Sequence, residues 1–262
     1  MKRNLLLILS VLFFVSCSVK EDRIVCPCRL RLDLSPCKSI TADVVTCAWD
    51  DSGQVRYFRD EVSVLDLKGY YEQDVKRGPV NISVYTAPDD NVEDGRMIMA
   101  TYGQDFDAIY SYADNAACSG EIYIDTVRLY KQYATVHVKL ERHEVKSYPY
   151  SFNVESDVAG LDLITLSPVR GEFHYDIVFD DTDLCSFNIP RHDKEAGGLS
   201  LNIVKAGEIM DSVSLSEIFI AMDYDWTADD LDDIYIRLDY TEAVVRVSIA
   251  DWGEGIKRDI VI

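Results

Sequence analysis

Hydrophobic and polar residues alternate along most of the chain with a period of two, which is typical of half-buried β-strands. The first such stretch runs from Cys28 to Ser35, with apolar residues at its even positions and polar residues at its odd positions. Further strands are expected at residues 45–49, 54–59, 61–67, 79–85, 121–129 and 133–141 of the first half. In the second half they are expected at 150–155, 173–179, 184–189, 199–204, 234–240, 244–251 and 257–262. The pattern predicts an all-β fold.

No stretch has the pattern of a long amphipathic helix, and helical turns are expected only at residues 110–115 and 227–232. Residues 87–96 are rich in Pro, Asp and Gly and predict a loop. Strands that recur every 8 to 15 residues with turns between them favour β-sandwiches. We expect two, at residues 26–125 and 126–262, because a new strand pattern begins after Asp125. No Pro/Gly-rich linker separates them, so close packing is expected.

Leu5–Val15 is an unbroken run without a charge that follows Lys2 and Arg3 and is followed by Ser16 and Cys17. This is the arrangement of a secretory signal peptide, and the run is shorter than the roughly 20 residues that span a bilayer. A Cys directly after a small residue is similar to a lipoprotein signal, although Phe14 replaces the more usual Leu. We therefore expect residues 1–16 to be removed, Cys17 to be acylated, and residues 17–25 to form a tether. The alternative is an ordinary signal peptide with an incidental Cys17.

Acidic residues outnumber basic ones by 46 to 26, which gives a formal charge of −20. Such a charge argues against nucleic acid as a partner and against adhesion to anionic lipid, so membrane attachment is expected only through the covalent lipid. Export permits disulfides. One or two bridges are expected among Cys26, Cys28, Cys37, Cys47 and Cys118, with the pairing left open. Cys185 shares strand parity with Phe187 and Ile189 and is expected to be buried and unpaired.

Sequence motifs of catalysis, metal binding or cofactor binding are not found. The four histidines stand at wide spacing, and we expect them to be solvated and structural. The Cys26-Pro27-Cys28 segment lacks the second pair that a zinc site needs. The acidic stretch at residues 89–95 is similar to a calcium loop, but Val92 breaks the ligand spacing, so a solvated loop is favoured. We expect neither an enzyme nor a cofactor.

Four segments together resemble a known family. They are Cys26–Leu32 shortly after the lipoprotein signal, Val127–Val138 at the start of the second half, Asp232–Tyr240, and Val247–Trp252 near the end. They resemble the FimB-type fimbrillin-associated anchor proteins of Bacteroidales type V fimbriae. The resemblance extends over nearly the whole mature chain and lies in the order and character of its segments. The segments near the C-terminus are its most specific part.

The resemblance implies two tandem transthyretin-like β-sandwiches and a lipidated outer-membrane protein, on the cell surface, that roots a fimbrial shaft. Shaft subunits of such fimbriae join by strand exchange, a form of β-augmentation. An anchor that keeps its first strand can still offer its C-terminal strands to the next subunit. By analogy the expected contact residues are Val245, Val247, Ile249, Trp252, Ile260 and Ile262. Arg29 and Arg31 could mimic a protease site within the first strand.

A cell-surface lipoprotein that binds glycans or host ligands is the alternative function. Exposed aromatic side chains could stack on sugars, or they could equally cover sheet edges. The candidates are Tyr70, Tyr71, Tyr110 and Tyr112. An aromatic platform on one exposed face would favour this alternative over the fimbrial role.

Overall fold

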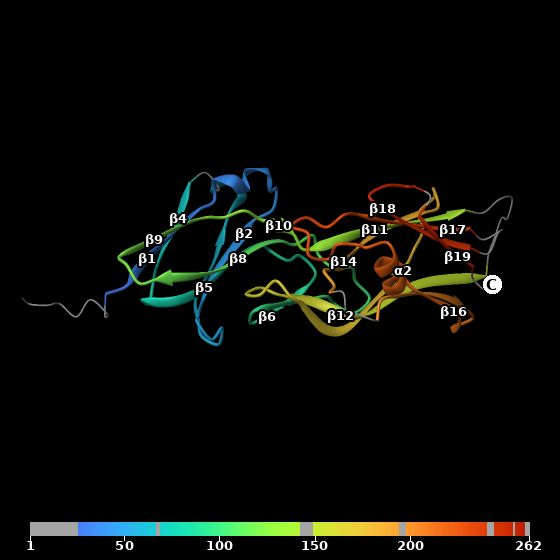
Figure 1. Ribbon diagram of the computed structural model, residues 1–262, viewed down its shortest axis with the longest axis horizontal. Helices are drawn as coiled ribbons and strands as arrows, with labels where there is room; N and C mark the ends of the chain where they lie inside the picture. The colour runs from blue at the N-terminus through green and yellow to red at the C-terminus, as the bar shows by residue number, and fades with distance from the viewer. Residues whose placement is uncertain are drawn as a thin grey trace, which may run out of the picture.

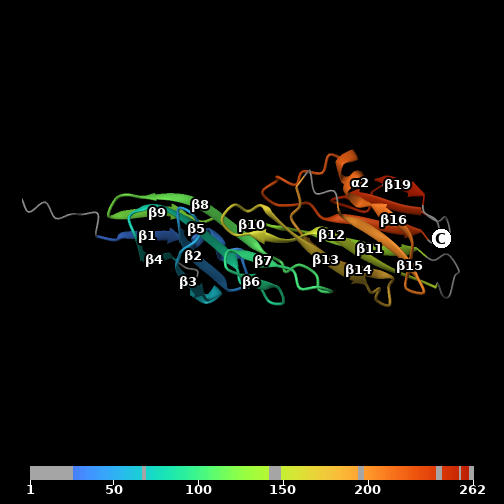
Figure 2. The ribbon, with the colours of Figure 1, turned by 90° about the horizontal axis from the view of Figure 1, so that it is seen from below.

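The computed structural model describes residues 26–66, 69–141, 149–193, 198–239, 244–253 and 255–259. The chain folds into an elongated, almost entirely β molecule with two groups of sheets placed end to end (Figures 1 and 2). No helix among these residues is long and apolar enough to cross a membrane.

The first group contains most of the strands of the first half of the chain. Its strands are β1 (Cys28–Asp33), β2 (Val44–Asp50), β3 (Arg56–Val62), β4 (Tyr70–Val75), β5 (Gly78–Thr86), β8 (Tyr110–Cys118), β9 (Ile122–Thr126) and β10 (Tyr130–Lys131). Two short 3-10 helices, η1 (Ser35–Ser39) and η2 (Val64–Asp66), connect them. The strands form a three-stranded sheet, β4-β1-β9, and a five-stranded sheet, β10-β8-β5-β2-β3. The apolar faces of both sheets contribute to one core.

The second group contains the longer strands and the helix α2 (Leu215–Ala221). Its strands are β11 (Tyr133–Glu141), β12 (Tyr150–Asp162), β13 (Pro168–Ile177), β14 (Leu184–Pro190), β15 (Ser200–Lys205), β16 (Glu208–Ser214), β17 (Ile234–Asp239), β18 (Val244–Ile249) and β19 (Ile256–Asp259). One sheet has the order β14-β11-β17-β18-β19. The other has the order β16-β15-β12-β7-β6, and β13 pairs with β12 beside that path. A second core lies between these sheets.

The two groups are joined by shared strands and by a third apolar cluster. The strands β6 (Val92–Asp94) and β7 (Met97–Met99) come from the first half of the chain but extend a sheet of the second half through β12. The third cluster combines β2 residues such as Trp49 with Ile98 of β7 and Leu161 of β12. It explains why residues 44–49 are buried on both faces of the strand instead of alternating. The division at residue 125 stays a prediction.

The structure corrects several local predictions. Residues 110–115 form strand β8 rather than a helical turn, because β5 and β10 pair with it on either side. Residues 227–232 form turns, with Asp225 accepting hydrogen bonds from Thr227. The strand expected at 61–67 is not formed as such, because β3 ends at Val62 and η2 follows at Val64–Asp66. The loop expected at 87–96 contains the short strand β6.

The helix α2 was not predicted, although its sequence carries a start signal. Ser214 precedes the helix, and its Oγ accepts a hydrogen bond from the backbone N–H of Glu217 at 3.2 Å. A Ser followed three residues later by Glu is the capping-box pattern of a helix N-terminus. Leu215, Ile218 and Phe219 bury one face of this short helix against the second core.

Candidate subunit-contact site

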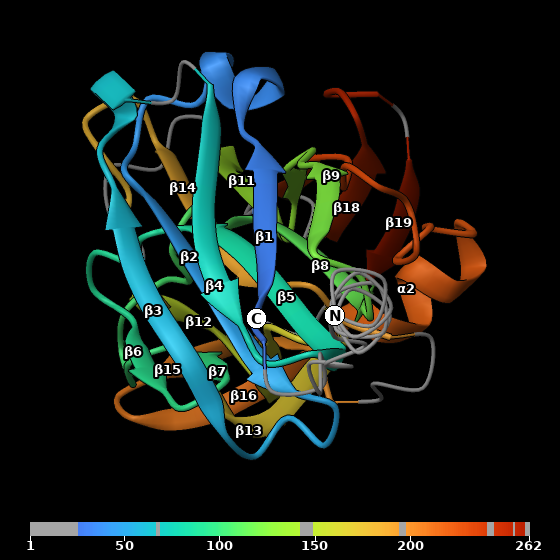
Figure 3. The ribbon, with the colours of Figure 1, turned by 90° about the vertical axis from the view of Figure 1, so that its left-hand side faces the viewer.

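Strand β1 occupies the centre of the three-stranded sheet at the outer end of the molecule (Figure 3). It pairs antiparallel with β4 and parallel with β9, so both of its backbone edges are hydrogen-bonded. Its even-numbered side chains, Cys28, Leu30 and Leu32, have no exposed surface. The alternation of the sequence therefore places one face of the strand in the first core. A one-residue shift in the pairing register of β1 would turn each of these apolar side chains towards water.

The polar face of β1 is fixed to β4 by ion pairs between cross-strand neighbours. Arg29 Nε donates to Asp74 Oδ1 at 3.0 Å, and Arg31 Nε donates to Glu72 Oε1 at 2.6 Å. The Arg31 guanidinium also lies 5.3 Å from the ring centroid of Tyr70. The hydrogen bond with Asp74 raises the pKa of Arg29. Both arginines therefore lie within a fully paired strand, unlike the exposed loop tips that proteases prefer.

The C-terminal hairpin lies in the second group of sheets, away from β1 (Figures 1 and 2). Strand β18 pairs with both β17 and β19, whereas β19 is the edge of its sheet. Val245 and Val247 have no exposed surface, and Ile249 is half-buried. Trp252 is also half-buried, with its ring 4.9 Å from that of Tyr235. Val245 and Val247 can therefore contact another subunit through their side chains only if the hairpin moves, whereas Ile249 and Trp252 are partly exposed.

Two predicted sites lie outside the described residues. Cys17, the expected lipid attachment, precedes them, and the contact candidates Ile260 and Ile262 follow them. Their roles stay predictions.

The cysteines between residues 26 and 259 are all free thiols. The one or two expected bridges among Cys26, Cys28, Cys37, Cys47 and Cys118 are therefore not formed in this structure. Burial raises the pKa of Cys37 and Cys47 to about 11 and contributes most to raising that of Cys118 to about 12. Disulfide formation requires a thiolate, so these thiols react slowly near neutral pH. Cys185 is buried in the second core, as predicted.

The prediction of solvated histidines is wrong for His192, which is 2% exposed. Its Nδ1 lies 2.7 Å from the carbonyl oxygen of Pro190, and its Nε2 lies 2.7 Å from Ser156 Oγ. Because a carbonyl can only accept, Nδ1 carries the proton and Nε2 accepts from the hydroxyl. Burial lowers the pKa of His192 to about 4, so the ring is neutral at physiological pH.

The four candidate tyrosines do not form one platform. Tyr70 and Tyr71 are neighbours on β4 and point to opposite faces of its sheet. Tyr110 and Tyr112 lie on β8, in the other sheet of the first group. The hydroxyl of Tyr71 donates to Asp60 at 2.5 Å. The aromatic platform that would favour the alternative function is therefore absent at these four positions.

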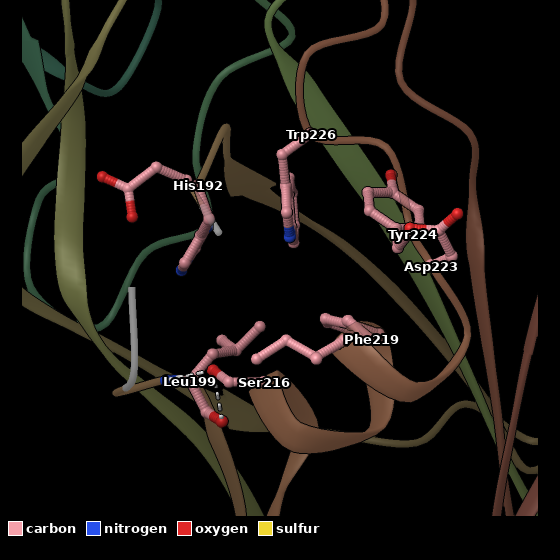
Figure 4. A pocket seen from close by; sticks show the side chains of 9 residues that line it. His192, Leu199, Ser216, Phe219, Asp223, Tyr224 and Trp226 are labelled. Atoms are coloured by element: carbon pink, nitrogen blue, oxygen red, sulfur yellow. Dashed lines mark hydrogen bonds between the residues drawn. The ribbon is translucent and has the colours of Figure 1, made fainter. Parts of the chain in front are cut away.

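Aromatic residues gather instead around a pocket beside α2, which the sequence analysis missed (Figure 4). The pocket has a volume of about 160 Å³. Trp226 is central, with ring centroids 4.5 Å from Tyr224, 5.0 Å from His192 and 5.8 Å from Phe219. These rings come from α2, from the segment after it and from the segment after β14. Only the capping box of α2 gave a local signal for this region.

Solved structures with the same fold are known. A candidate polysaccharide-binding protein of Bacteroides thetaiotaomicron matches with a TM-score of 0.62 and 11% identity, over 89% of this chain and 98% of that one. A candidate adhesin of Bacteroides ovatus matches with a TM-score of 0.58 and 12% identity, over 88% and 96%. The fimbrial anchor protein Mfa2 of Porphyromonas gingivalis matches with a TM-score of 0.57 and 12% identity, over 88% and 99%.

These identities are low, so the likeness establishes the fold, which extends over nearly the whole of each solved chain. A scan of protein-family models and a search of curated proteins find no match for the sequence. The three solved proteins are named for binding, adhesion or fimbrial anchoring rather than for an enzymatic activity.

Proposed function

We propose that this chain is a lipid-anchored accessory subunit that attaches a type V fimbrial shaft to the outer membrane. One observation carries the proposal: β1 fills the centre of its own sheet, so the first sandwich is complete without a strand from a neighbour. A subunit whose first sandwich needs no donated strand cannot accept a neighbour there. If it offers a strand of its own at the other end, it forms the last subunit of a strand-exchange polymer. The shared fold with a fimbrial anchor protein supports this role.

The position of the expected lipid supports the same role. Cys17 lies a short tether ahead of β1, so load from a shaft would reach the membrane through this strand. Both edges of β1 are paired, and its arginines are held by β4. Extracting the strand would break these hydrogen bonds and expose Leu30 and Leu32 to water. This arrangement suits a retained strand at the base of a polymer.

The C-terminal hairpin is the proposed contact with the next subunit. Among the described residues β19 pairs with β18 alone, and an unpaired strand edge is a template for another strand. Two modes of contact follow. In the first, a strand of the partner pairs with the free edge of β19. In the second, the hairpin leaves its own sheet and inserts the apolar residues Val245 and Val247 into the core of the neighbouring subunit.

Retention of fimbriae tests the proposal in cells. The variant Cys17→Ala removes the lipid site, and Cys26→Ala is the matched control because Cys26 is an exposed free thiol outside the lipoprotein signal. We expect Cys17→Ala cells to shed polymer into the medium and Cys26→Ala cells to keep it on washed cells. Unchanged retention and length in Cys17→Ala cells would contradict the anchor role.

A truncation separates the shaft contact from the membrane attachment. A chain that ends at Gly253 lacks β19, while its tether and β1 are unchanged. We expect the truncated protein to remain in the membrane fraction and the shaft to be lost. Circular dichroism of the purified chain controls for folding. A shaft that stays attached to a folded, truncated subunit would exclude β19 as the contact.

A further inference from the structure

Two cysteines of the first group of sheets, Cys28 and Cys118, are fully buried in the same apolar core. We propose that these two residues form a disulfide as the exported chain folds, and that the bond joins β1 covalently to β8. The use of such a bond rests on the proposed anchoring role, whereas its existence is tested without it.

The strand pairing places the two cysteines at the same end of the facing sheets. Cys28, the first residue of β1, lies opposite Val75 of β4. Cys118, the last residue of β8, lies opposite Gly78 of β5. The strands β4 and β5 follow each other in the chain, and only two residues separate Val75 from Gly78. The partners of these two residues are therefore close in space.

A backbone contact holds this end of the two sheets together. The N–H of Arg29 donates to the carbonyl oxygen of Glu121 at 2.8 Å. Glu121 follows Cys118 by three residues, which span at most about 11 Å. The side chains of Cys28 and Cys118 have no exposed surface, so both point into the core between the sheets. Converging side chains on neighbouring backbone are what a disulfide requires.

The two thiols also interact directly. Burial, the nearby Cys28 and a side-chain hydrogen bond with Cys28 together raise the pKa of Cys118 to about 12. A hydrogen bond between the side chains makes the two sulfur atoms neighbours in the core. Small rotations of the side chains then suffice to bring the sulfur atoms to bonding distance.

The other buried cysteines are not placed to compete. Cys47 and Cys185 belong to the other two apolar clusters. Cys37 shares the core, but it lies in η1 beyond the far end of β1. A strand of six residues is about 17–20 Å long, and a disulfide needs Cα atoms less than about 7 Å apart. Cys26 is exposed just before β1, so it is the alternative that the test must separate.

The oxidation balances when a second disulfide accepts the electrons. The two thiols lose two protons and two electrons as the S–S bond forms, and the disulfide of a thiol oxidase or of glutathione is reduced to two thiols. In the folded protein neither Cys28 nor Cys118 is accessible to such an oxidant. The bond therefore forms while β1 docks, before the core closes.

The bond changes how load passes from the expected lipid to the rest of the molecule. Cys28 is at the end of β1 nearest the expected tether. A pulling force that enters there passes through the S–S bond to β8 and the five-stranded sheet. The hydrogen bonds of β1 are then not loaded one after another. The bond also closes a long loop, which restricts the unfolded chain and stabilises the fold.

Peptide mapping of the refolded protein tests the pairing. The purified chain without residues 1–17 is denatured, refolded in a glutathione redox buffer and checked by circular dichroism. Remaining thiols are blocked with N-ethylmaleimide in denaturant, and the protein is digested with trypsin without reduction. This experiment needs neither the lipid nor a fimbria.

The variant Cys26→Ala removes the one ambiguity of the map. Trypsin leaves Cys26 and Cys28 together in the peptide 24–29, whereas Cys118 is the single cysteine of the peptide 97–128. We expect mass spectrometry of the folded variant to find these two peptides linked. Blocked thiols at both positions, or a link from Cys118 to a different cysteine, would overturn the proposal.

Urea unfolding with and without reductant tests whether the bond supports the fold. Dithiothreitol during refolding should lower the urea midpoint of Cys26→Ala. It should do the same when Cys37→Ala, which removes a buried thiol outside the bond, is added as the control. It should have no effect when Cys118→Ala is added instead. An equal effect of dithiothreitol in all three proteins would contradict the bond.

The bond and the anchor role fail in different experiments. Unlinked peptides overturn the bond and leave the anchor role standing. Unchanged fimbrial retention in Cys17→Ala cells overturns the anchor role, and the linked peptides would still be found.

Discussion

The first strand, β1, and the last described strand, β19, differ in how they are paired and packed. Strand β1 has a paired neighbour on each side, ion pairs on its polar face and three fully buried side chains. Strand β19 is the four-residue segment Ile256–Asp259, and within the part of the chain that the structure describes it pairs with β18 alone. Among the described residues, the strand nearest the expected lipid is therefore paired on both sides, whereas the outermost strand of the other group of sheets has an edge without a partner.

Truncating an apolar side chain in each strand gives the largest expected difference. Leu30→Ala in β1 should lower the free energy of unfolding by about 2–5 kcal/mol, because it removes a fully buried side chain and leaves a cavity. Ile256→Ala in β19 should cost about 1 kcal/mol, since Ile256 is only half-buried. Urea unfolding of both variants measures the two costs. Equal costs would remove the contrast between the strands.

Acid should weaken the second group of sheets through His192. Its pKa is about 4 in the fold and about 6.5 in an unfolded chain, so the unfolded state takes up the proton first. The contribution of the neutral His192 ring to the free energy of unfolding is therefore fully present above pH 6.5. It is lost as the pH falls towards 4, and the total loss is about 3 kcal/mol. The pH dependence of unfolding of the parent, compared with His192→Gln, isolates this contribution. The same slope in both proteins would contradict it.

A backbone variant loosens the hairpin alone. Gly255 has a φ of +51°, and a Cβ added there would lie 1.8 Å from the carbonyl oxygen of Val247. Gly255→Ala should cost more than about 1 kcal/mol and speed hydrogen exchange in β18 and β19, but not in β1. The control is Gly120→Ala, where the nearest atom is 3.6 Å away and the expected change is within about 0.5 kcal/mol. Faster exchange in β1 would show that the two ends are coupled.

The smallest expected effect concerns the ion pairs that hold β1. Arg29 and Arg31 are 52% and 34% exposed, so water screens their pairs with Asp74 and Glu72. Each change to Ala should lower the urea midpoint only slightly, and by less at high salt. Urea midpoints at low and high salt measure this. A larger, salt-independent loss would mean that the arginines contribute mainly through packing.

The sequence predicted those parts of the fold where one face of a strand meets a core and the other meets water. The alternation placed Leu30, Val136 and Ile236 inside correctly. It could not predict that β2 is buried on both faces, because the second face is covered by residues about 50 to 120 positions later in the chain. Strand β8 was mistaken for a helical turn for a similar reason: its pairing with β5 and β10 is tertiary.

The candidate site was predicted in part. The alternation of β18 indicated correctly that Val245 and Val247 share an inward face. Whether the hairpin leaves that position depends on a partner that the sequence does not contain. The pocket around Trp226 was not predicted, because its walls come from separate segments between residues 192 and 226 and no spacing motif connects them. The burial of His192 was missed for the same reason.

Site-specific photocrosslinking in cells tests most directly whether β1 stays in its own sheet while β19 meets the next subunit. A photoreactive residue is placed at position 257 in β19, and in a matched variant at position 29 in β1. We expect a crosslink to another fimbrial subunit from position 257 and only intramolecular products from position 29. Intermolecular crosslinks from position 29, with none from position 257, would contradict it.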